Sequence, residues 1–224
     1  MPGGIIFEFP DLYLFPSGLW LTIQLSAISL LGSVVIGTFV AIARISPLAP
    51  FRWIGTGFVE FFRNTPLLVQ LFFLFFAAPL IGIRFSDDAF EFNFRAALLG
   101  LSLYHAAYVA EIVRGGLLGV DKGQLEAARS LGLSYPQMLR FIQLPQSFRA
   151  IIPPLGNIAI ALVKNTSLAT TIGVAELLNA GDIVESRTFR TVEAYGAVAL
   201  LYLVLTLPMG AAVNWLERRL AVAR

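Results

Sequence analysis

Long apolar runs constrain the fold of this chain more than any other feature. Five stretches are apolar and almost free of charged side chains: residues 12–43, 64–83, 96–110, 150–175 and 194–216. Lys164 is the one charge inside the fourth, and the third can extend through Glu111 and Arg114 at its end. A helix needs about 20 apolar residues to cross a bilayer. The chain is therefore predicted to be an all-α membrane protein with about five transmembrane helices.

Composition supports this class and excludes others. Hydrophobic residues make up 57% of the chain and charged residues 13%, with a mean hydropathy of +0.78, outside the usual range of soluble proteins. The net charge of +2 comes from loop arginines, so no nucleic-acid partner is expected. Cysteine is absent, which removes disulfides and thiolate chemistry. The phosphate-loop, HExxH and GxSxG motifs are missing too. We predict no catalytic residue, metal or cofactor in this chain, and a single transmembrane domain over 1–224.

The positive charges predict an orientation. The first apolar run has acids rather than a basic region before it, and it is too long for a signal peptide, so we expect it to be retained as a span. With the N-terminus outside and the C-terminus inside, eleven basic residues are cytoplasmic: Arg44, Arg52, Arg63, Arg114, Lys122, Arg129, Arg140, Arg149, Arg218, Arg219 and Arg224. Five are then extracytoplasmic: Arg84, Arg95, Lys164, Arg187 and Arg190. This distribution satisfies the positive-inside rule.

One polar stretch of about 35 residues interrupts the apolar sequence between Glu111 and Gln146. Residues 124–131 are predicted to form a short helix that ends at Gly132, because glycine readily takes the left-handed conformation of a helix end. A second helix should begin at Ser134, with Gln137 completing a capping box and Pro136 tolerated in the first turn. Met138, Leu139 and Ile142 would line one face of it, and Pro145 would end it. The segment 115–146 is thus predicted to be a helix-turn-helix on the cytoplasmic side, a shape that fits a partner's groove.

The same stretch resembles a known family. Glu126-Ala127-Ala128, then Gly132 after three residues, and Ile142-Gln143-Leu144-Pro145 resemble the cytoplasmic loop of bacterial ATP-binding-cassette (ABC) importer permeases. The resemblance implies a bacterial inner-membrane protein whose loop docks on a separate ATPase subunit. It further implies that ATP and Mg²⁺ are bound by that partner. The residues implied in coupling to the ATPase are Glu126, Ala127, Ala128, Gly132 and Pro136.

Polar residues inside the spans point to a substrate path, because they are costly there without a purpose. Thr65-Pro66 is expected to break the second span, since proline disfavours helical geometry in the residue before it. A second interruption is expected at residues 164–167, after a short fourth segment that starts at Pro153-Pro154 and before a short helix at 168–178 that Asn179-Ala180-Gly181 would end. Interrupted helices carry the binding sites of many transporters. The candidate substrate-path residues are Glu60, Asn64, Gln70, Tyr104, Lys164, Asn165 and Thr166.

Three segments narrow the resemblance: residues 63–70, 108–116 and 164–168 look like the polar amino acid uptake branch of these permeases. The resemblance covers nearly the whole chain from about Gly18. It implies a membrane subunit that imports glutamate, glutamine, histidine or a basic amino acid. The implied partners are two ATPase subunits, a second permease subunit (a copy or a paralogue), an extracytoplasmic solute-binding protein and membrane lipid.

Simpler interpretations of individual residues stay open. Lys164 can place its ammonium among lipid headgroups while its stem stays buried. Glu111 and Arg114 can form a plain ion pair on one helix face, and His105 lacks partners at catalytic spacing, which favours an interhelical hydrogen bond. An ion-gradient-driven secondary transporter or channel is the alternative function, and a membrane scaffold is a third. The secondary transporter or channel gives the cytoplasmic helix-turn-helix no role.

Overall fold

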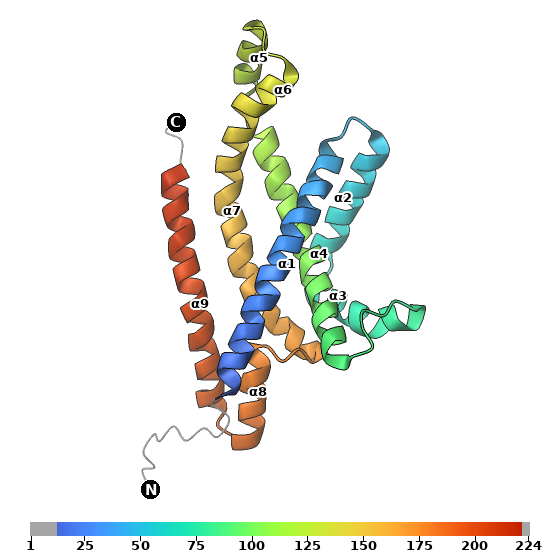
Figure 1. The fold of residues 1–224 in the computed structure, drawn as a ribbon, viewed down its shortest axis with the longest axis vertical. Coiled ribbons are helices and arrows are strands. Elements are labelled where there is room, and N and C mark those ends of the chain that lie inside the picture. The colour runs from blue at the N-terminus through green and yellow to red at the C-terminus, as the bar shows by residue number, and fades with distance from the viewer. Residues whose placement is uncertain (1–12, 221–224) are drawn as a thin grey trace.

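The predicted apolar runs correspond to long helices that lie roughly side by side in an elongated bundle (Figure 1). The computed structural model describes residues 13–220, so the predicted positions of the two chain ends lie outside the described residues. Four helical stretches are long and apolar enough to cross a membrane, and a bent pair makes a fifth. The described elements are α1 (Leu14–Ile45), α2 (Ala49–Asn64), α3 (Leu67–Phe72), η1 (Phe73–Ala77), η2 (Ala78–Ile81), α4 (Ala89–Leu118), α5 (Lys122–Ser130), α6 (Tyr135–Met138), η3 (Leu139–Gln143), α7 (Leu144–Asn165), η4 (Thr166–Ile172), α8 (Leu177–Thr188) and α9 (Thr191–Leu220).

Small residues let α1 and α4 pack closely at the centre of the bundle. The buried face of α1 repeats small side chains every three or four residues, among them Ser29, Ser33 and Gly37. A Cβ atom at Gly37 would stand 2.7 Å from the carbonyl oxygen of Ala106. Water does not drive helices together inside a bilayer, so such close backbone contact is a main source of their association. The tight α1–α4 pair is the frame on which the other helices are placed.

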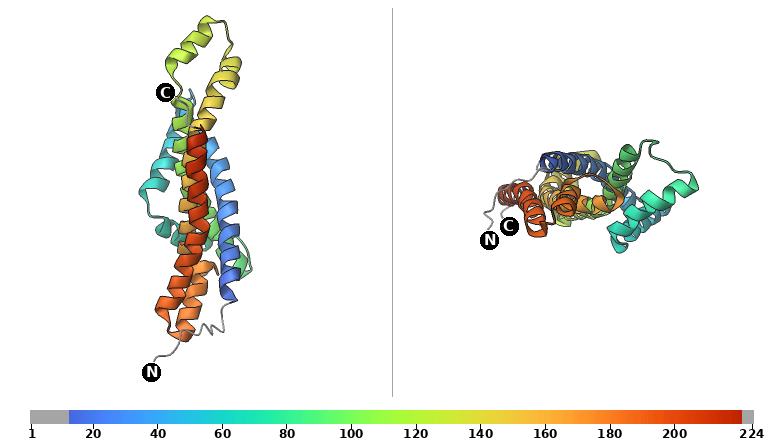
Figure 2. Two further views of the ribbon diagram at one scale, coloured as in Figure 1. Left: turned by 90° about the vertical axis from the view of Figure 1, so that its left-hand side faces the viewer. Right: turned by 90° about the horizontal axis from the view of Figure 1, so that it is seen from below.

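The two ends of the bundle differ (Figures 1 and 2). Helices α5 and α6 project beyond one end, where the last turn of α9 and the α1–α2 connection also lie. Helix α8 and the first turn of α1 lie at the opposite end. The chain therefore has a small helical knob, residues 122–143, at one end only.

The apolar run over residues 64–83, predicted as the second span, is not one straight continuation of a helix. Helix α2 ends at Asn64, and the segment 67–81 leaves it at an angle of 105°. Pro66 is the reason, because Thr65 before it is extended, with φ −113° and ψ 141°. The predicted break at Thr65-Pro66 is thus confirmed, but the apolar residues after it do not continue the direction of α2.

The prolines of the fourth segment do not act as predicted. Pro145 lies in the first turn of α7 rather than ending a helix, and the wide π turn η3 before it admits a residue without an N–H donor. Pro153 and Pro154 lie inside α7, not at its start. They remove two backbone donors from the helix, yet α7 continues to Asn165. The fourth span is therefore longer than the sequence pattern indicated.

The segment after α7 also differs from its prediction. The expected helix 168–178 is instead a 3₁₀ helix, η4, that ends before Gly173 at φ +77°. Gly181 was expected to end a helix but lies inside α8. A Cβ atom there would stand 2.5 Å from the side chain of Val198, so this glycine serves the close approach of α8 to α9.

A buried carboxylate fixes α8 in place. Glu176 is fully buried at the N-terminus of α8, and its Oε1 accepts from the Asn179 N–H at 3.0 Å. Its Oε2 accepts from the Leu178 N–H at 3.0 Å and from the Tyr202 hydroxyl on α9 at 2.9 Å. Thr22 on α1 completes the group by accepting from the Leu177 N–H at 3.1 Å. We call these residues the Glu176 hub; it joins α1, α8 and α9.

Candidate functional site

The first helix of the knob, α5, has a side-chain cap at its N-terminus and a left-handed glycine after its C-terminus. Asp121 caps α5 by accepting from the Gly123 N–H at 2.8 Å. At the other end, the Leu133 N–H donates to the Ala128 carbonyl at 3.1 Å, and Gly132 has φ +79°. This is the left-handed ending predicted for Gly132. The helix spans Lys122–Ser130 rather than 124–131, because Asp121 starts it earlier.

The second helix of the knob starts at the predicted residue. The Gln137 Oε1 accepts from the Ser134 backbone N–H at 2.8 Å, which forms the expected capping box, and Pro136 lies in the first turn. The chain is then helical without a gap from Tyr135 through η3 and α7 to Asn165. One helical segment therefore connects the knob to the bundle.

The knob is fastened to the bundle but leaves apolar side chains outside. The Gln146 side chain donates to Gln124 at 2.6 Å, and the Gln143 side chain donates to the Leu117 carbonyl of α4 at 2.9 Å. Three large apolar side chains stay exposed: Leu131 (81%), Tyr135 (65%) and Phe141 (63%). Leu131 and Phe141 line a groove of about 350 Å³, together with Ala127 and Ala128. Glu126 and Ala127 are exposed, whereas Ala128 is buried.

Gln70 holds the two halves of the broken span together. Its buried side chain donates to the carbonyls of Phe62 (3.1 Å) and Thr65 (3.2 Å) and to the Thr65 hydroxyl (2.7 Å). These carbonyls lie at the end of α2, where no intrahelical donor follows. Gln70 thus stabilises the corner between α2 and α3, while its Oε1 stays buried without a hydrogen-bond partner.

Polar side chains form a continuous strip on α4. The Tyr104 and Tyr108 hydroxyls lie 3.0 Å apart, and the Tyr104 ring contacts the His105 ring edge-on at 5.2 Å between centroids. His105 is buried and donates through Nδ1 to the Leu101 carbonyl at 2.8 Å, which leaves Nε2 to accept from the Asn165 amide at 3.2 Å. The interhelical hydrogen bond predicted for His105 is confirmed. It joins α4 to the end of α7.

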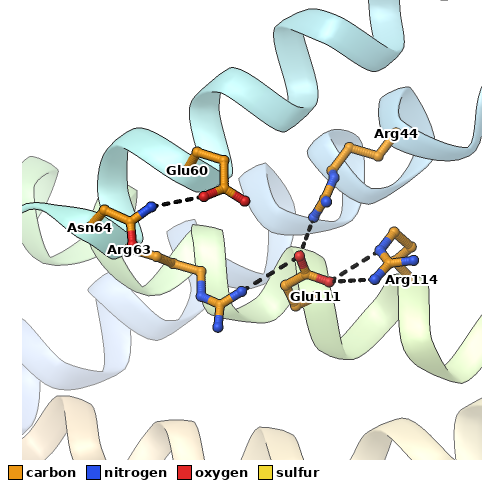
Figure 3. A network of polar contacts seen from close by, with 6 residues as sticks. All are labelled: Arg44, Glu60, Arg63, Asn64, Glu111 and Arg114. Atoms are coloured by element: carbon orange, nitrogen blue, oxygen red, sulfur yellow. Dashed lines mark hydrogen bonds and ion pairs between the residues drawn. The ribbon is translucent and has the colours of Figure 1, made fainter.

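The strip continues into a cluster of arginines around Glu111 (Figure 3). Arg114 donates to Glu111 Oε2 from Nε at 3.1 Å and from Nη2 at 2.8 Å, so the predicted ion pair is confirmed. Arg44 of α1 donates to Oε1, and the Arg63 Nη1 of α2 lies 3.5 Å from the same oxygen. Arg63 also lies over the Tyr108 ring, 5.4 Å from its centroid. We call Arg44, Arg63, Glu111 and Arg114 the Glu111 cluster.

The remaining substrate-path candidates have less in common. The Asn64 amide donates to Glu60 at 2.8 Å on the exposed face of α2, close to the Glu111 cluster in Figure 3. Lys164 is exposed. Thr166 is buried, and its hydroxyl donates to the Val163 carbonyl of its own helix turn at 2.7 Å. Thr166 therefore offers no free hydroxyl to a substrate.

Sequence reasoning missed three residues. Arg44 and Arg63 were not predicted as partners of Glu111, although both reach it. Glu176 was passed over, although it is the single charged residue in the stretch 165–181. A lone acid in an otherwise neutral apolar stretch is the signal that would have marked it.

Long apolar helices, a span broken at proline and a polar strip between helices define a membrane-embedded transporter subunit, and comparison with known proteins identifies the kind. Residues 33–222 match the family described as binding-protein-dependent transport system inner membrane component. The chain belongs to this family. It is therefore a multi-pass inner-membrane permease subunit of a bacterial ABC importer, as the sequence resemblance indicated. Membership implies ATPase and binding-protein partners.

Individual relatives are similar over almost their whole length. The chain is 42% identical over 212 residues to the probable glutamine ABC transporter permease protein GlnM of Bacillus subtilis, covering 95% of each chain. It is 37% identical over 213 residues to the glutamine transport system permease protein GlnP of Escherichia coli, again covering 95% of each. The crystal structure of an amino acid ABC transporter with histidines superposes with a TM-score of 0.85 at 36% identity, covering 92% of this chain and 94% of that one. The all-α permease fold is thereby confirmed.

Proposed function

We propose that this chain moves polar amino acids across the inner membrane as the permease subunit of an ATP-driven importer, with glutamine and glutamate the first substrates to test. The similarity over 95% of the length to a probable glutamine permease is the observation that carries this proposal. The polar strip on α4 supports it, because hydroxyl, imidazole and amide groups can replace the water around a zwitterion. Histidine and basic amino acids are the other members of the class.

The knob is proposed as the docking site of the ATPase subunit, which binds ATP and Mg²⁺. Leu131, Tyr135 and Phe141 are large apolar side chains exposed on the knob, and Leu131 and Phe141 line one groove. Such an exposed apolar group on a polar segment is typical of an interaction surface. Glu126 lies beside it and is exposed. The coupling residues are then Glu126, Ala127, Ala128, Gly132 and Pro136, with Gly132 and Pro136 shaping the corner rather than contacting the partner.

A second permease subunit is proposed to cover the strip on α4. Tyr104 and Tyr108 are half-buried and Arg63 is exposed in the single chain, so the strip forms one wall of a path and needs a second wall. A second copy or a paralogue of this chain would supply that wall by the pairing typical of membrane transporters. An extracytoplasmic binding protein would deliver the amino acid to the path.

The proposed orientation places the knob in the cytoplasm. The basic residues Lys122, Arg129 and Arg140 lie on the knob, and Arg218 and Arg219 lie in the last turn of α9 at the same end. Lys and Arg concentrate on the cytoplasmic side of bacterial membrane proteins. Helix α8 and the start of α1 then face the extracytoplasmic side.

Closure of the ATPase pair would act through the knob on the strip. The continuous helical segment 135–165 runs from the knob to Asn165, which contacts His105 on α4. A push on the knob would therefore reach the strip along one helix. The substrate is moved only if the two states of the path bind it with different affinity.

The experiment is uptake by membrane vesicles that contain the whole importer. Valine at Gly132 opposes φ +79°, so Gly132→Val should abolish vanadate-sensitive amino-acid uptake and release the ATPase subunit on purification. Gly132→Asn should keep much of the activity, because asparagine tolerates this conformation. Gly210→Val is the matched control, since a side chain there meets no neighbouring atom within 4 Å. Uptake driven by an ion gradient without ATP would instead favour the secondary-transporter alternative.

A further inference from the structure

The Glu111 cluster carries more positive charge than its own carboxylate neutralises. Three guanidinium groups from α1, α2 and α4 surround one carboxylate, a surplus of two positive charges. In the described part of the chain, the nearest other acid on these elements, Glu60, hydrogen-bonds to Asn64 and forms no ion pair with the three arginines. A surplus of like charges in one place creates a positive potential that attracts an anion. The cluster is thus built to receive a further negative group.

The three arginines are not equivalent. Arg114 forms two hydrogen bonds to Glu111, and the Arg44 side chain is only 12% exposed, with Gly55 of α2 packed against its stem. Arg63 has an ion-pair contact to Glu111 at 3.5 Å and no hydrogen bond among the described residues. Its side chain is 43% exposed. Arg63 is therefore the group with free donors and with access for a ligand.

The surroundings of Arg63 also orient it. The Arg63 Cζ lies over the Tyr108 ring, and Tyr108 in turn hydrogen-bonds to Tyr104 in the polar strip. Contact with a ring face leaves the guanidinium N–H groups unused, and their fork matches the two oxygens of a carboxylate. The free edge of Arg63 thus lies where the strip meets the cluster.

We propose that Arg63, supported by Arg44 and Arg114, is an oxyanion-binding site in which Glu111 is the internal ligand that an incoming anion replaces. The α-carboxylate of an amino acid leaving the strip toward the cytoplasm is the first source of that oxyanion, and this form rests on the proposed function. The phosphate of an anionic lipid has the same chemistry and is the second source. The site selects the carboxylate that all amino acid substrates share, so it serves release rather than the choice of side chain.

The test is binding to the purified permease–ATPase complex in nanodiscs of phosphatidylcholine. L-glutamine, L-glutamate, L-histidine and L-arginine are each titrated beside the corresponding α-amide, which lacks the carboxylate. We expect an amino acid to bind at least about tenfold more tightly than its amide, and Arg63→Gln to remove this preference. Arg63→Lys should retain part of it, because the charge stays while the planar fork is lost. Arg52→Gln is the control on the same helix, since Arg52 donates only to the carbonyls of Ser46 and Pro47.

A second variant, Glu111→Gln, is expected to tighten amino-acid binding, whereas Arg63→Gln weakens it. Glu111→Gln removes the internal competitor and leaves the arginines, so it should tighten amino-acid binding several-fold while leaving amide binding unchanged. A merely structural ion cluster would predict weaker binding of both ligands or none. This variant thereby separates an anion site from a simple fastening of α1, α2 and α4.

Lipid is distinguished by repeating the titrations in phosphatidylglycerol. If the site takes lipid phosphate, phosphatidylglycerol will co-purify with the wild-type complex and not with Arg63→Gln, and it will weaken amino-acid binding in the wild type alone. The proposal is overturned if Arg63→Gln changes neither the carboxylate preference nor lipid retention. That outcome would leave the importer assignment intact, because the assignment is tested by uptake and not by this binding.

Discussion

Two glutamates in this chain occupy opposite environments, and the difference separates holding the fold from working in transport. Glu176 is fully buried and bound by neutral donors from α8 and α9, at the N-terminus of a helix whose dipole favours a negative charge. Glu111 is 22% exposed and is surrounded by three charged guanidiniums. The first carboxylate has its hydrogen bonds satisfied and no room for a ligand. The second is one member of a group with surplus charge and an open side.

The comparison shows two ways in which a carboxylate can be accommodated among the helices of this chain. A buried charge is tolerated when hydrogen bonds replace its water completely, and the Glu176 hub achieves this with backbone and hydroxyl donors. Such a group fixes helices but cannot respond to a passing ion. Partial exposure leaves the Glu111 cluster able to exchange partners. The hub should therefore matter for stability, and the cluster for transport.

The largest effect on stability is expected for Glu176→Gln. An amide presents an NH₂ group to buried donors, so the variant should lose roughly 2–4 kcal/mol of unfolding free energy. Thermal and denaturant unfolding of the purified complex in micelles would measure it. Glu193→Gln on the exposed start of α9 is the control and should change stability by less than about 0.5 kcal/mol. If Glu176→Gln and Glu193→Gln had the same unfolding free energy, the hub would have no structural role.

A smaller and salt-sensitive effect is expected for Glu111→Gln. The exposed side of the cluster is solvated, so the loss should be roughly 1–2 kcal/mol at low salt. The Debye length falls from about 10 Å at 0.1 M to about 3 Å at 1 M. High salt should therefore shrink the Glu111→Gln difference while leaving that of Glu176→Gln unchanged. A salt-independent Glu111→Gln difference would show that this carboxylate is as enclosed as Glu176.

The smallest loss of unfolding free energy is expected when one hydrogen-bond donor to Glu176 is removed. Tyr202→Phe removes a single hydrogen bond to Glu176 Oε2, which still accepts from the Leu178 N–H. The expected loss is about 1 kcal/mol. Tyr195→Phe is the matched control. The Tyr195 hydroxyl also donates to a carboxylate, that of Asp182, but the Tyr195 residue is 38% exposed. The hub would be loosely packed if both variants unfolded at the wild-type temperature.

Local chemistry was predictable from the sequence where a few neighbouring residues decide the backbone. The left-handed end at Gly132, the capping box of Ser134 and Gln137, and the break at Thr65-Pro66 all depend on residues within one turn. The positions of the long helices followed from apolar runs for the same reason. The family was indicated by a resemblance in short motifs, and the match over residues 33–222 shows it.

Features that depend on distant segments were not predictable. Pro153 and Pro154 looked like a helix start, but they lie inside α7, which continues past them to Asn165. Gly181 looked like a helix end, but Val198 on α9 is what requires a glycine there. Arg44 and Arg63 meet Glu111 only because α1, α2 and α4 converge. The pattern of residues within one helix does not predict such contacts between helices.

Uptake per folded complex in the Arg63→Gln variant tests the division between hub and cluster most directly. Membrane vesicles with equal amounts of assembled wild-type or variant importer would be given ATP, the binding protein and radiolabelled L-glutamine or L-glutamate. Arg63 makes one partly exposed ion pair and one ring contact but no hydrogen bond among the described residues. The account therefore predicts a change of less than about 1 kcal/mol in unfolding free energy and a loss of vanadate-sensitive uptake of about tenfold or more. Normal uptake by Arg63→Gln, or a lowered unfolding midpoint that accounts for the whole loss, would contradict it.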